Sequence, residues 1–357
     1  MQTHRIAVIA GDGVGPEVIP VGTRVLTRAA ELDGRFRLEF EEFPWGCDYY
    51  RRTGRMMAED AIETLRRHDA IYLGAIGSPG VPDHVSSWGV QLRIRQEFEL
   101  FVNLRPIRLF PGVRSPLRAF EAGGIDFVCV RENSEGEYAG AGGRVHRGFD
   151  EDLAVQVEVF TRTGIERVAR YAFELARRRR KQLTSVTKSN ALAHSFVLWD
   201  EVVDSVAAEF PDVAAARVYG DAAAAFLVTK PDAFDVILAS NLFGDVLTDL
   251  GAAVQGSLGL AASANLNPSG GFPGMFEPAH GSAPDIAGRG VANPLGAVWS
   301  GALLLEELGY PDAADSVLQG MMRVLAAGGP RTPDLGGDAS TDEVGDAVEG
   351  ALAVGAR

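Results

Sequence analysis

Short apolar runs rich in β-branched residues recur along the chain, and stretches with helical spacing lie between them. The runs at residues 5–10, 70–75, 125–130, 183–187 and 234–239 are too short for core helices and are typical of buried parallel strands. Strands that alternate with helices in this way predict an α/β fold with a parallel or mixed sheet.

Local signals mark several further elements. Residues 163–180 carry an apolar face and predict a helix, while residues 149–160 alternate and predict a strand or an arm. Asn293 and Pro294 supply a cap and a first-turn proline for a later helix, and residues 340–343 form a capping box. The length of 357 residues favours two domains or one large α/β unit.

The stretch after the run at 234–239 carries the strongest chemical signal. Asn241 lies at the expected carboxyl end of that strand, and the following helix has Asp245 and Asp249 on one face, one turn apart. Two carboxylates this close repel unless a cation lies between them, and Mg²⁺ or Mn²⁺ prefers oxygen ligands. Taken alone, such a pair is more often a solvated helix face.

Acidic residues outnumber basic ones by 48 to 34, which argues against nucleic acid or a membrane surface as the main partner. The basic run at 177–181 closes a helix, and we interpret it as a solvated face that offsets the helix dipole. Four arginines fall between residues 93 and 108. They favour capture of a carboxylate or phosphate, with ion pairing to Glu97 and Glu99 as the equal alternative.

A glycine loop at residues 11–15 follows the first strand, but the dinucleotide fingerprint requires a glycine where Pro16 stands. We also find no acidic residue that closes a matching second strand about 20 residues further on. The glycines are therefore expected to let the backbone approach a ligand closely, without marking a Rossmann site.

Cys47 and Cys129 are far apart and are predicted to be buried free thiols of a reducing compartment. No stretch approaches 18 apolar residues, and the first residues lead into a strand without a signal-peptide pattern. We therefore interpret the chain as cytoplasmic.

Six motifs, in this order, resemble those of the β-decarboxylating dehydrogenases that act on D-2-hydroxy acids: GDGVGPE, NLRP, VRENSEGEY, TKSN, SNLFGDVLTDL and EPAHGSAPDIAGRGVANP. This family includes isopropylmalate, isocitrate, tartrate and D-malate dehydrogenases. The resemblance implies an isopropylmalate dehydrogenase-like two-domain fold with a mixed parallel and antiparallel sheet, not a Rossmann fold. Residues 1–100 with 252–357 would bind the cofactor, and residues 101–251 would bind substrate and metal and form a homodimer.

The resemblance also implies a shared active site in the cleft between these domains. A Mg²⁺ or Mn²⁺ ion would be held by Asp245 and Asp249 with Asp221 from the second subunit. Substrate carboxylates would be bound by the arginines Arg95, Arg105 and Arg131. Lys188 of the partner subunit would remove the hydroxyl proton, and Tyr138 would protonate the enolate left after CO₂ departs.

The implied cofactor is NAD, with K⁺ left open as a further requirement. The residues that the resemblance assigns to it are Asn190, near the nicotinamide, and His280, Gly281, Ser282, Ala283, Asp285, Ile286 and Asn293, around the adenosine. Asp285 favours NAD over NADP because a carboxylate suits a free 2′-hydroxyl and repels a 2′-phosphate.

Substrate choice depends on the helix that leads to Arg95. Its sequence DHVSSWG resembles DHVSLWG of the tartrate and D-malate branch, with Ser87 in place of leucine. Trp88 would fill the alkyl pocket and leave room for a small C4 diacid, whereas 3-isopropylmalate is the alternative substrate. The small residues at 222–225 also depart from the family around Asp221. A metal-dependent lyase or a non-catalytic anion-binding module is the alternative from another class.

Overall fold

The computed structural model describes residues 1–353, and the chain divides into two compact units. The first unit comprises residues 1–100, 106–125 and the chain from 252 onward, and the second comprises residues 101–105 and 126–251. Residues 106–125, which we expected in the second domain, therefore group with the first unit.

The first unit contains a mixed sheet, as the sequence predicts. Its strand order is β2 (Phe36–Glu42), β1 (Gln2–Gly11), β3 (Ala70–Ala75), β12 (Gly274–Pro278) and β11 (Ala262–Leu266). The first three pairings are parallel, whereas β11 and β12 are antiparallel. The parallel strands are connected through helices, because the chain must return to the same end of the sheet before it can start the next parallel strand.

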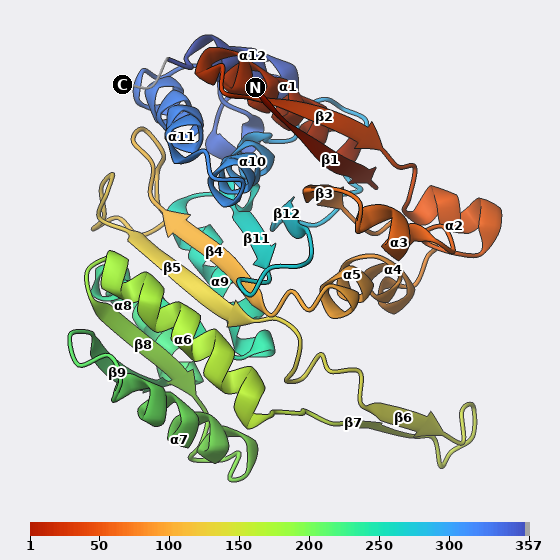
Figure 1. The fold of residues 1–357 in the computed structure, drawn as a ribbon, viewed down its shortest axis with the longest axis vertical. Helices are drawn as coiled ribbons and strands as arrows, with labels where there is room; N and C mark the ends of the chain where they lie inside the picture. Colours follow the sequence, from red (N-terminus) through yellow and green to blue (C-terminus); the bar gives the residue numbers. More distant parts are fainter. Residues whose placement is uncertain (354–357) are drawn as a thin grey trace. The chain divides into compact units, whose positions relative to one another are not determined.

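Helices α1 (Gly15–Asp33) and α10 (Leu295–Glu307) pack on these strands, and α11 (Pro311–Ala326) and α12 (Thr341–Gly350) pack on the helices in turn (Figure 1). Helix α1 ends at Gly34, whose φ of 74° is the left-handed conformation that glycine adopts without strain. The capping box predicted for α12 is present, with Ser340 and Glu343 bonded reciprocally.

Two short helices, not one, lead to Arg95. Helix α4 (Asp83–Gly89) stops at Val90, and α5 (Gln91–Glu97) starts directly after it. The backbone of Val90 leaves the helical region with φ −130° and ψ −79°, and its side chain is buried in a cluster with Ile94 and Phe98. This break sets the direction of α5, which carries Arg95. Two further helices, α2 (Cys47–Thr53) and α3 (Ala61–Leu65), complete this region.

The second unit has strands in the order β4 (Val102–Arg108, in its first residues), β5 (Asp126–Glu132), β10 (Val236–Ala239), β8 (Gln182–Thr187) and β9 (Ala214–Tyr219). The pairings from β5 to β9 are all parallel, so their carboxyl ends meet at one edge. The helices of this part are α6 (Arg162–Arg178), α7 (Ser195–Ala207), α8 (Gly220–Thr229) and α9 (Asn241–Gln255).

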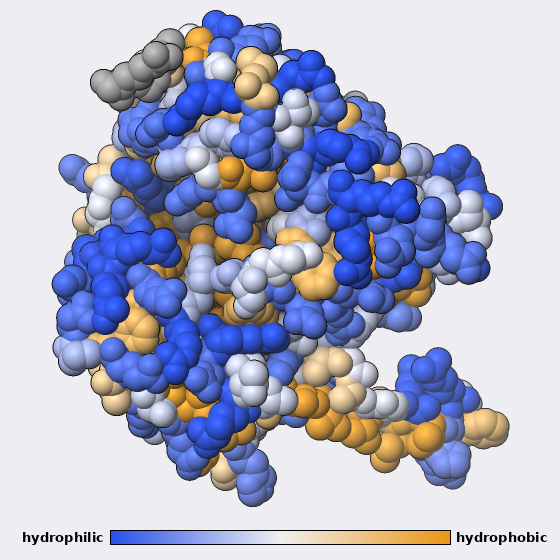
Figure 2. All heavy atoms as spheres, viewed as in Figure 1, coloured by the Kyte–Doolittle hydropathy of each residue, from blue (hydrophilic) through white to orange (hydrophobic). Residues whose placement is uncertain are grey.

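A β-hairpin of β6 (Gly142–Val145) and β7 (Leu153–Gln156) forms the arm that the alternating pattern predicts. Large apolar side chains line it at 37–70% exposure: Val145, Phe149, Leu153, Val155, Val157 and Val159. Figure 2 shows hydrophobic residues along the arm. An isolated two-stranded hairpin is marginally stable in water. The apolar arm is therefore a candidate for burial against another chain.

The basic run at residues 177–181 is mostly exposed, as expected for a solvated face, but Arg179 within it is partly buried and paired. Arg179 donates to Asp235 at 2.8 Å and to Asp126 at 2.7 Å, while Arg177 and Lys181 pair with Asp212. Asp235 is 1% exposed and also accepts from the backbone N–H of residue 180 at 2.8 Å. The run thus clamps the end of α6 to the start of β10, because a buried carboxylate requires such partners.

Asp235→Asn is therefore expected to destabilise the protein by about 3 kcal/mol, since it neutralises the buried carboxylate that pairs with Arg179 and leaves that guanidinium only Asp126 as an ion-pair partner. Urea unfolding followed by circular dichroism measures the effect. Asp212→Asn, which removes the exposed pair with Arg177, is the matched control and should change stability little. Equal stability of the two variants would contradict the clamp.

The cysteines are buried free thiols, as predicted. Burial raises the pKa of both Cys47 and Cys129 to about 12, so neither is a thiolate at neutral pH. Among residues 1–353, no helix has the length and apolar character needed to cross a membrane.

Candidate active site

The two aspartates that the sequence singles out lie one turn apart on α9, at the carboxyl edge of the second-unit strands. Asp245 is 34% exposed and Asp249 is 61% exposed. Partial removal from water raises the pKa of Asp249, and the charge of Asp245 raises it further against the opposing effect of Arg105. The pair is thus a concentration of negative charge.

Arg131 lies at the end of β5 and is 1% exposed. Its Nε and one terminal nitrogen donate to the Asn241 Oδ1 at 3.0 and 2.8 Å, and the other terminal nitrogen donates to Asp245. Gly244 makes room for it, because a Cβ there would lie 2.6 Å from the Arg131 side chain. The strand end and the helix start are thereby locked together.

Arg105 reaches the same aspartates from β4. Its Nε donates to Asn103 and one terminal nitrogen donates to the Thr248 Oγ1, each at 2.8 Å. The remaining contacts are with Asp245 at 3.3 Å and with Asp249 at 3.7 Å. Two buried guanidinium groups therefore face the two carboxylates, which suits a site for an anion together with a cation.

Tyr138 joins this cluster by donating its hydroxyl to the Asp245 Oδ2 at 3.1 Å. Its ring lies under the Arg131 guanidinium at 5.5 Å. Burial, with the nearby Asp245 charge, raises the pKa of Tyr138. The phenol therefore keeps its proton at neutral pH and is available as a proton donor.

Lys188 and Asp221 form a second polar pair in the second unit. The register of β8 and β9 matches Thr187 with Tyr219, so the strand ends place the residues that follow side by side. The Lys188 Nζ donates to the Asp221 Oδ1 at 3.0 Å, which lowers the pKa of Asp221. Asp221 remains 72% exposed.

The structure does not bring Asp221 to the other two aspartates within one chain. In the described part of the chain, no three residues of the His, Cys, Asp and Glu types form a group that could hold a metal ion. One chain thus offers two carboxylate ligands at α9 and presents Asp221 and Lys188 elsewhere on its surface.

Arg95 belongs to the first unit and is 6% exposed on α5. One terminal nitrogen donates to the Glu277 Oε1 at 2.8 Å, and its Nε is buried without a hydrogen-bond partner in residues 1–353. The alternative of ion pairing to Glu97 and Glu99 does not hold for Arg95, whose ion pair in residues 1–353 is with Glu277. An unsatisfied buried donor of this kind fits an anionic ligand.

Glu277 is the functional candidate that the sequence reasoning missed. It is 2% exposed on β12 and accepts hydrogen bonds from Arg95, from Asn265 at 2.9 Å and from Gln91 at 2.8 Å. Although burial alone would raise its pKa, the charge of Arg95 and these three donors lower the pKa of Glu277. The sequence signal that could have identified Glu277 is a charged residue within an otherwise apolar strand.

The glycine loop after β1 packs closely against another segment of the chain. The backbone N–H of Val14 donates to the Ser282 carbonyl at 2.9 Å, and a Cβ at Gly13 would lie 1.9 Å from that oxygen. The loop therefore contacts the segment at residues 280–286, and a close approach of its backbone to a ligand stays a prediction.

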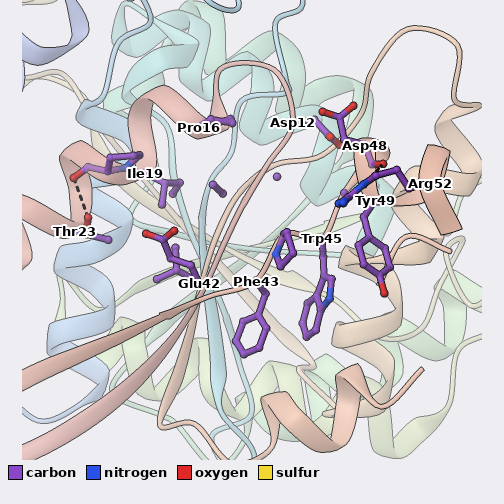
Figure 3. A pocket seen from close by; sticks show the side chains of 16 residues that line it. Asp12, Pro16, Ile19, Thr23, Glu42, Phe43, Trp45, Asp48, Tyr49 and Arg52 are labelled. Carbon is purple, nitrogen blue, oxygen red and sulfur yellow. Dashed lines mark hydrogen bonds between the residues drawn. The ribbon is translucent and has the colours of Figure 1, made fainter. Parts of the chain in front are cut away.

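A pocket of about 560 Å³ lies beside this loop, between β1, β2, α1 and α2 (Figure 3). Contrary to our expectation, an acidic residue, Glu42, does end the second strand and lines the pocket. Asp12 accepts from the backbone N–H groups of Cys47 and Gly77 at 2.8 and 2.9 Å. Its carboxylate thus ties together the loops around the pocket.

A second pocket, of about 580 Å³, is lined by most of the residues assigned to the adenosine: His280, Gly281, Ala283, Ile286 and Asn293. Burial lowers the pKa of His280, whose Nε2 is buried without a partner in the described chain. Asn293 donates to Asp334 at 2.9 Å, a residue that sequence reasoning also missed. Ser282 and Asp285 lie in the same segment but do not line the pocket, and Asp285 is exposed.

The remaining predicted residues lie apart from these centres. Asn190 is exposed after β8 and lines a smaller pocket of about 360 Å³ with Tyr219. Trp88, predicted to fill the alkyl pocket, is 37% exposed at the end of α4.

The fold and these sites define a class of two-unit α/β enzymes whose arginines and paired carboxylates suit an anionic substrate. The chain belongs to the isocitrate/isopropylmalate dehydrogenase family, whose model matches residues 5–348. The family resemblance drawn from the motifs is confirmed.

Similar proteins cover nearly the full length. The chain is 52% identical to a D-malate dehydrogenase [decarboxylating] of Escherichia coli over 356 residues, covering 98% of each chain. It is 50% identical to a probable tartrate dehydrogenase/decarboxylase of Bacillus subtilis over 349 residues, again 98% of each. An isocitrate dehydrogenase structure from Methylococcus capsulatus is 34% identical, with a TM-score of 0.87 and coverage of 98% of this chain and 99% of that one.

Proposed function

We propose that this protein is a metal-dependent, NAD-linked dehydrogenase that oxidises and decarboxylates a small C4 2-hydroxy diacid, tartrate or D-malate. The observation that carries the proposal is the convergence of Asp245 and Asp249 with Arg105, Arg131 and Tyr138 in one cluster. The relatives named for tartrate and D-malate support the choice of substrate. Enzymes of this family generally use NAD or NADP and a divalent metal ion.

The donor set at α9 fits a divalent cation. Asp245 and Asp249 supply carboxylate oxygens, and Mg²⁺ commonly binds one or two carboxylates while water and substrate complete its shell. Asp221 of a second subunit would add a third. When bound, the metal ion supplies Lewis acidity at the substrate hydroxyl and its C1 carboxylate.

The chain's own residues then bind the substrate and move its protons. Arg95, Arg105 and Arg131 bind the substrate carboxylates, because guanidinium groups match the geometry of a carboxylate. Lys188 of the partner subunit accepts the proton of the C2 hydroxyl during oxidation. Tyr138, whose raised pKa keeps it protonated, donates a proton to C3 after CO₂ leaves.

The pocket at residues 280–293 fits the adenosine of a dinucleotide. Leu258 and Ile286 offer apolar surface for a ring, and the unpartnered Nε2 of His280 offers a hydrogen-bond partner. The dinucleotide supplies the hydride acceptor when bound, and Asn190 would lie near its nicotinamide.

Asp285 is expected to set the preference for NAD over NADP. Asp285→Lys should lower the ratio of kcat/KM for NAD to kcat/KM for NADP by at least about tenfold, since the substitution turns repulsion of a 2′-phosphate into attraction. Steady-state kinetics with both dinucleotides measure the ratio. Asp60→Lys makes the same charge change on an exposed residue outside the segment at residues 280–293 and is the control. An unchanged ratio in Asp285→Lys would remove this assignment.

A homodimer follows from the same proposal. Lys188 and Asp221 are separate from the α9 aspartates within one chain, and the apolar hairpin of β6 and β7 lacks cover. Both features are explained if a second copy buries the arm and receives Lys188 and Asp221 in its active site.

The proposal is tested by NADH formation with Mn²⁺ and K⁺, with D-malate, the tartrate isomers, 3-isopropylmalate and isocitrate as substrates. Release of CO₂ is followed in parallel. Turnover of a C4 acid supports the proposal. A preference for 3-isopropylmalate would show that the proposed substrate is wrong but the proposed reaction is right. Formation of NADH without release of CO₂ would contradict the decarboxylation step.

A further inference from the structure

Residues 280–293, called the cofactor segment below, contribute to the pocket assigned to the adenosine and are held by the first turn of α1. The Glu17 Oε1 accepts from the backbone N–H of Gly288 at 2.5 Å, and its Oε2 accepts from that of Gly290 at 2.8 Å. Hydrogen bonds to an ionised group are stronger than neutral ones. Glu17 thus ties α1 to two amides that lie 271 and 273 residues further along the chain.

The two Glu17 bonds lie between residues that form the wall of the pocket. Ile286 is two positions before the first bonded amide, Val291 directly follows the second, and both line the pocket. The start of α1 also fixes the segment further upstream, because the backbone N–H of Val14 donates to the Ser282 carbonyl at 2.9 Å. The segment is therefore held on both sides of Ile286.

The backbone conformation of the segment explains why it needs such bonds. Gly288 and Gly290 have φ angles of 78° and 64°, and Ala283 has a φ of 41°, all in the left-handed region. Glycine enters this region freely and favours no single shape, whereas alanine enters it at a cost in free energy. Such a conformation persists only where the surrounding structure determines it, and Glu17 supplies part of that restraint.

We propose that Glu17 is a positioning residue for the cofactor, because its carboxylate holds the cofactor segment in the shape that receives the adenosine before the dinucleotide binds. The inference rests on the proposed function, which assigns this pocket to NAD. A loop that is already ordered lowers the entropic cost of binding, so Glu17 should affect NAD affinity and not the chemical step. An acidic residue in the first turn of α1 also suits the helix dipole, and that role alone would affect only stability.

Glu17→Gln tests the inference because it keeps the shape of the side chain and replaces one acceptor by a donor. The glutamine nitrogen would face a backbone N–H, so at least one of the two bonds is lost. The dissociation constant for NAD, measured by calorimetric titration, should rise by about tenfold. The KM for NAD should rise with it, whereas kcat should not fall. Glu31→Gln, the same change at an exposed residue of α1 that pairs with Arg28, is the control and should leave NAD binding unchanged.

A second measurement needs no cofactor. Amide hydrogen exchange of the NAD-free protein, followed by mass spectrometry, should be faster in the peptide that contains Gly288 and Gly290 in Glu17→Gln than in the wild type or in Glu31→Gln. Urea unfolding of the same variants measures the effect on global stability.

Faster exchange together with weaker NAD binding supports the inference. Faster exchange with unchanged NAD affinity would overturn it, because the shape that Glu17 holds would then not matter to the cofactor. Unchanged exchange, or a loss of stability as the sole effect, would overturn it as well. A wild-type protein that binds no NAD would refute the proposed function and with it the inference. The exchange experiment would still show whether Glu17 holds the segment, so the two failures are distinguishable.

Discussion

Asp249→Asn should lower the affinity for Mn²⁺ by about a hundredfold. Substitution of a residue that only contacts a metal ligand already lowers metal affinity by about 10–100-fold, and Asp249 is proposed to be a ligand itself. The neutral amide keeps the shape of the side chain but loses the charge that attracts a divalent cation. Asp249 is 61% exposed and its pair with Arg105 is long, at 3.7 Å, so the fold should tolerate the change. Calorimetric titration of the substrate-free protein with Mn²⁺ measures the loss.

Asp245 is a less suitable target for this experiment. It accepts from Arg131 and from Tyr138, so its removal would disturb the substrate groups together with the metal. Asp232→Asn changes an exposed aspartate of the same unit and serves as the control. Unchanged Mn²⁺ affinity in Asp249→Asn would contradict the assignment of the metal site to α9.

The strands of this fold were predictable because their signal is local. Apolar runs bounded by polar residues, such as that at 234–239, read directly as buried parallel strands, and the capping box at Ser340 marked a helix start. The order of strands was not predictable, since it depends on contacts between segments far apart in sequence. The strand β12, for example, pairs with β3 about 200 residues earlier.

The residues of the candidate site also fall into two groups, those that a local sequence pattern identifies and those that it does not. Asp245 and Asp249 were identifiable from helical spacing and Arg105 from the concentration of positive charge in an acidic chain, whereas Arg131 was named only through the family resemblance. Glu277 was missed because its role is created by partners 12 and about 180 residues away. No local pattern shows that three donors converge on one carboxylate.

The basic run and the glycine loop show why local explanations fail. Arg179 sits where a helix dipole alone would justify it, yet its partner is the buried Asp235. Gly13 sits where a dinucleotide loop would require it, yet it is pressed against Ser282. In both cases a distant segment, not the local sequence, determines what the residue does.

Lys188→Met should lower kcat by about 10²–10⁴-fold, the range that a general base contributes, with little change in NAD affinity. The substitution removes the amine but keeps an unbranched side chain at the end of β8. Stopped-flow or steady-state NADH formation gives kcat, and fluorescence titration gives the dissociation constant for NAD. Lys230→Met, which removes an amine lying over the Phe226 ring, is the control and should keep full turnover. Loss of NAD binding in step with turnover would contradict a role as the base.

Mixing two inactive variants tests whether Lys188 acts across a dimer. If each site combines Asp249 of one chain with Lys188 of the other, a dimer of Lys188→Met and Asp249→Asn chains contains one site with both native residues. Its second site carries both substitutions. Random exchange of subunits makes half of the dimers mixed, so activity should recover to about a quarter of the wild-type value. Variants that act within one chain would show no recovery, because every site would then lack one of the two groups.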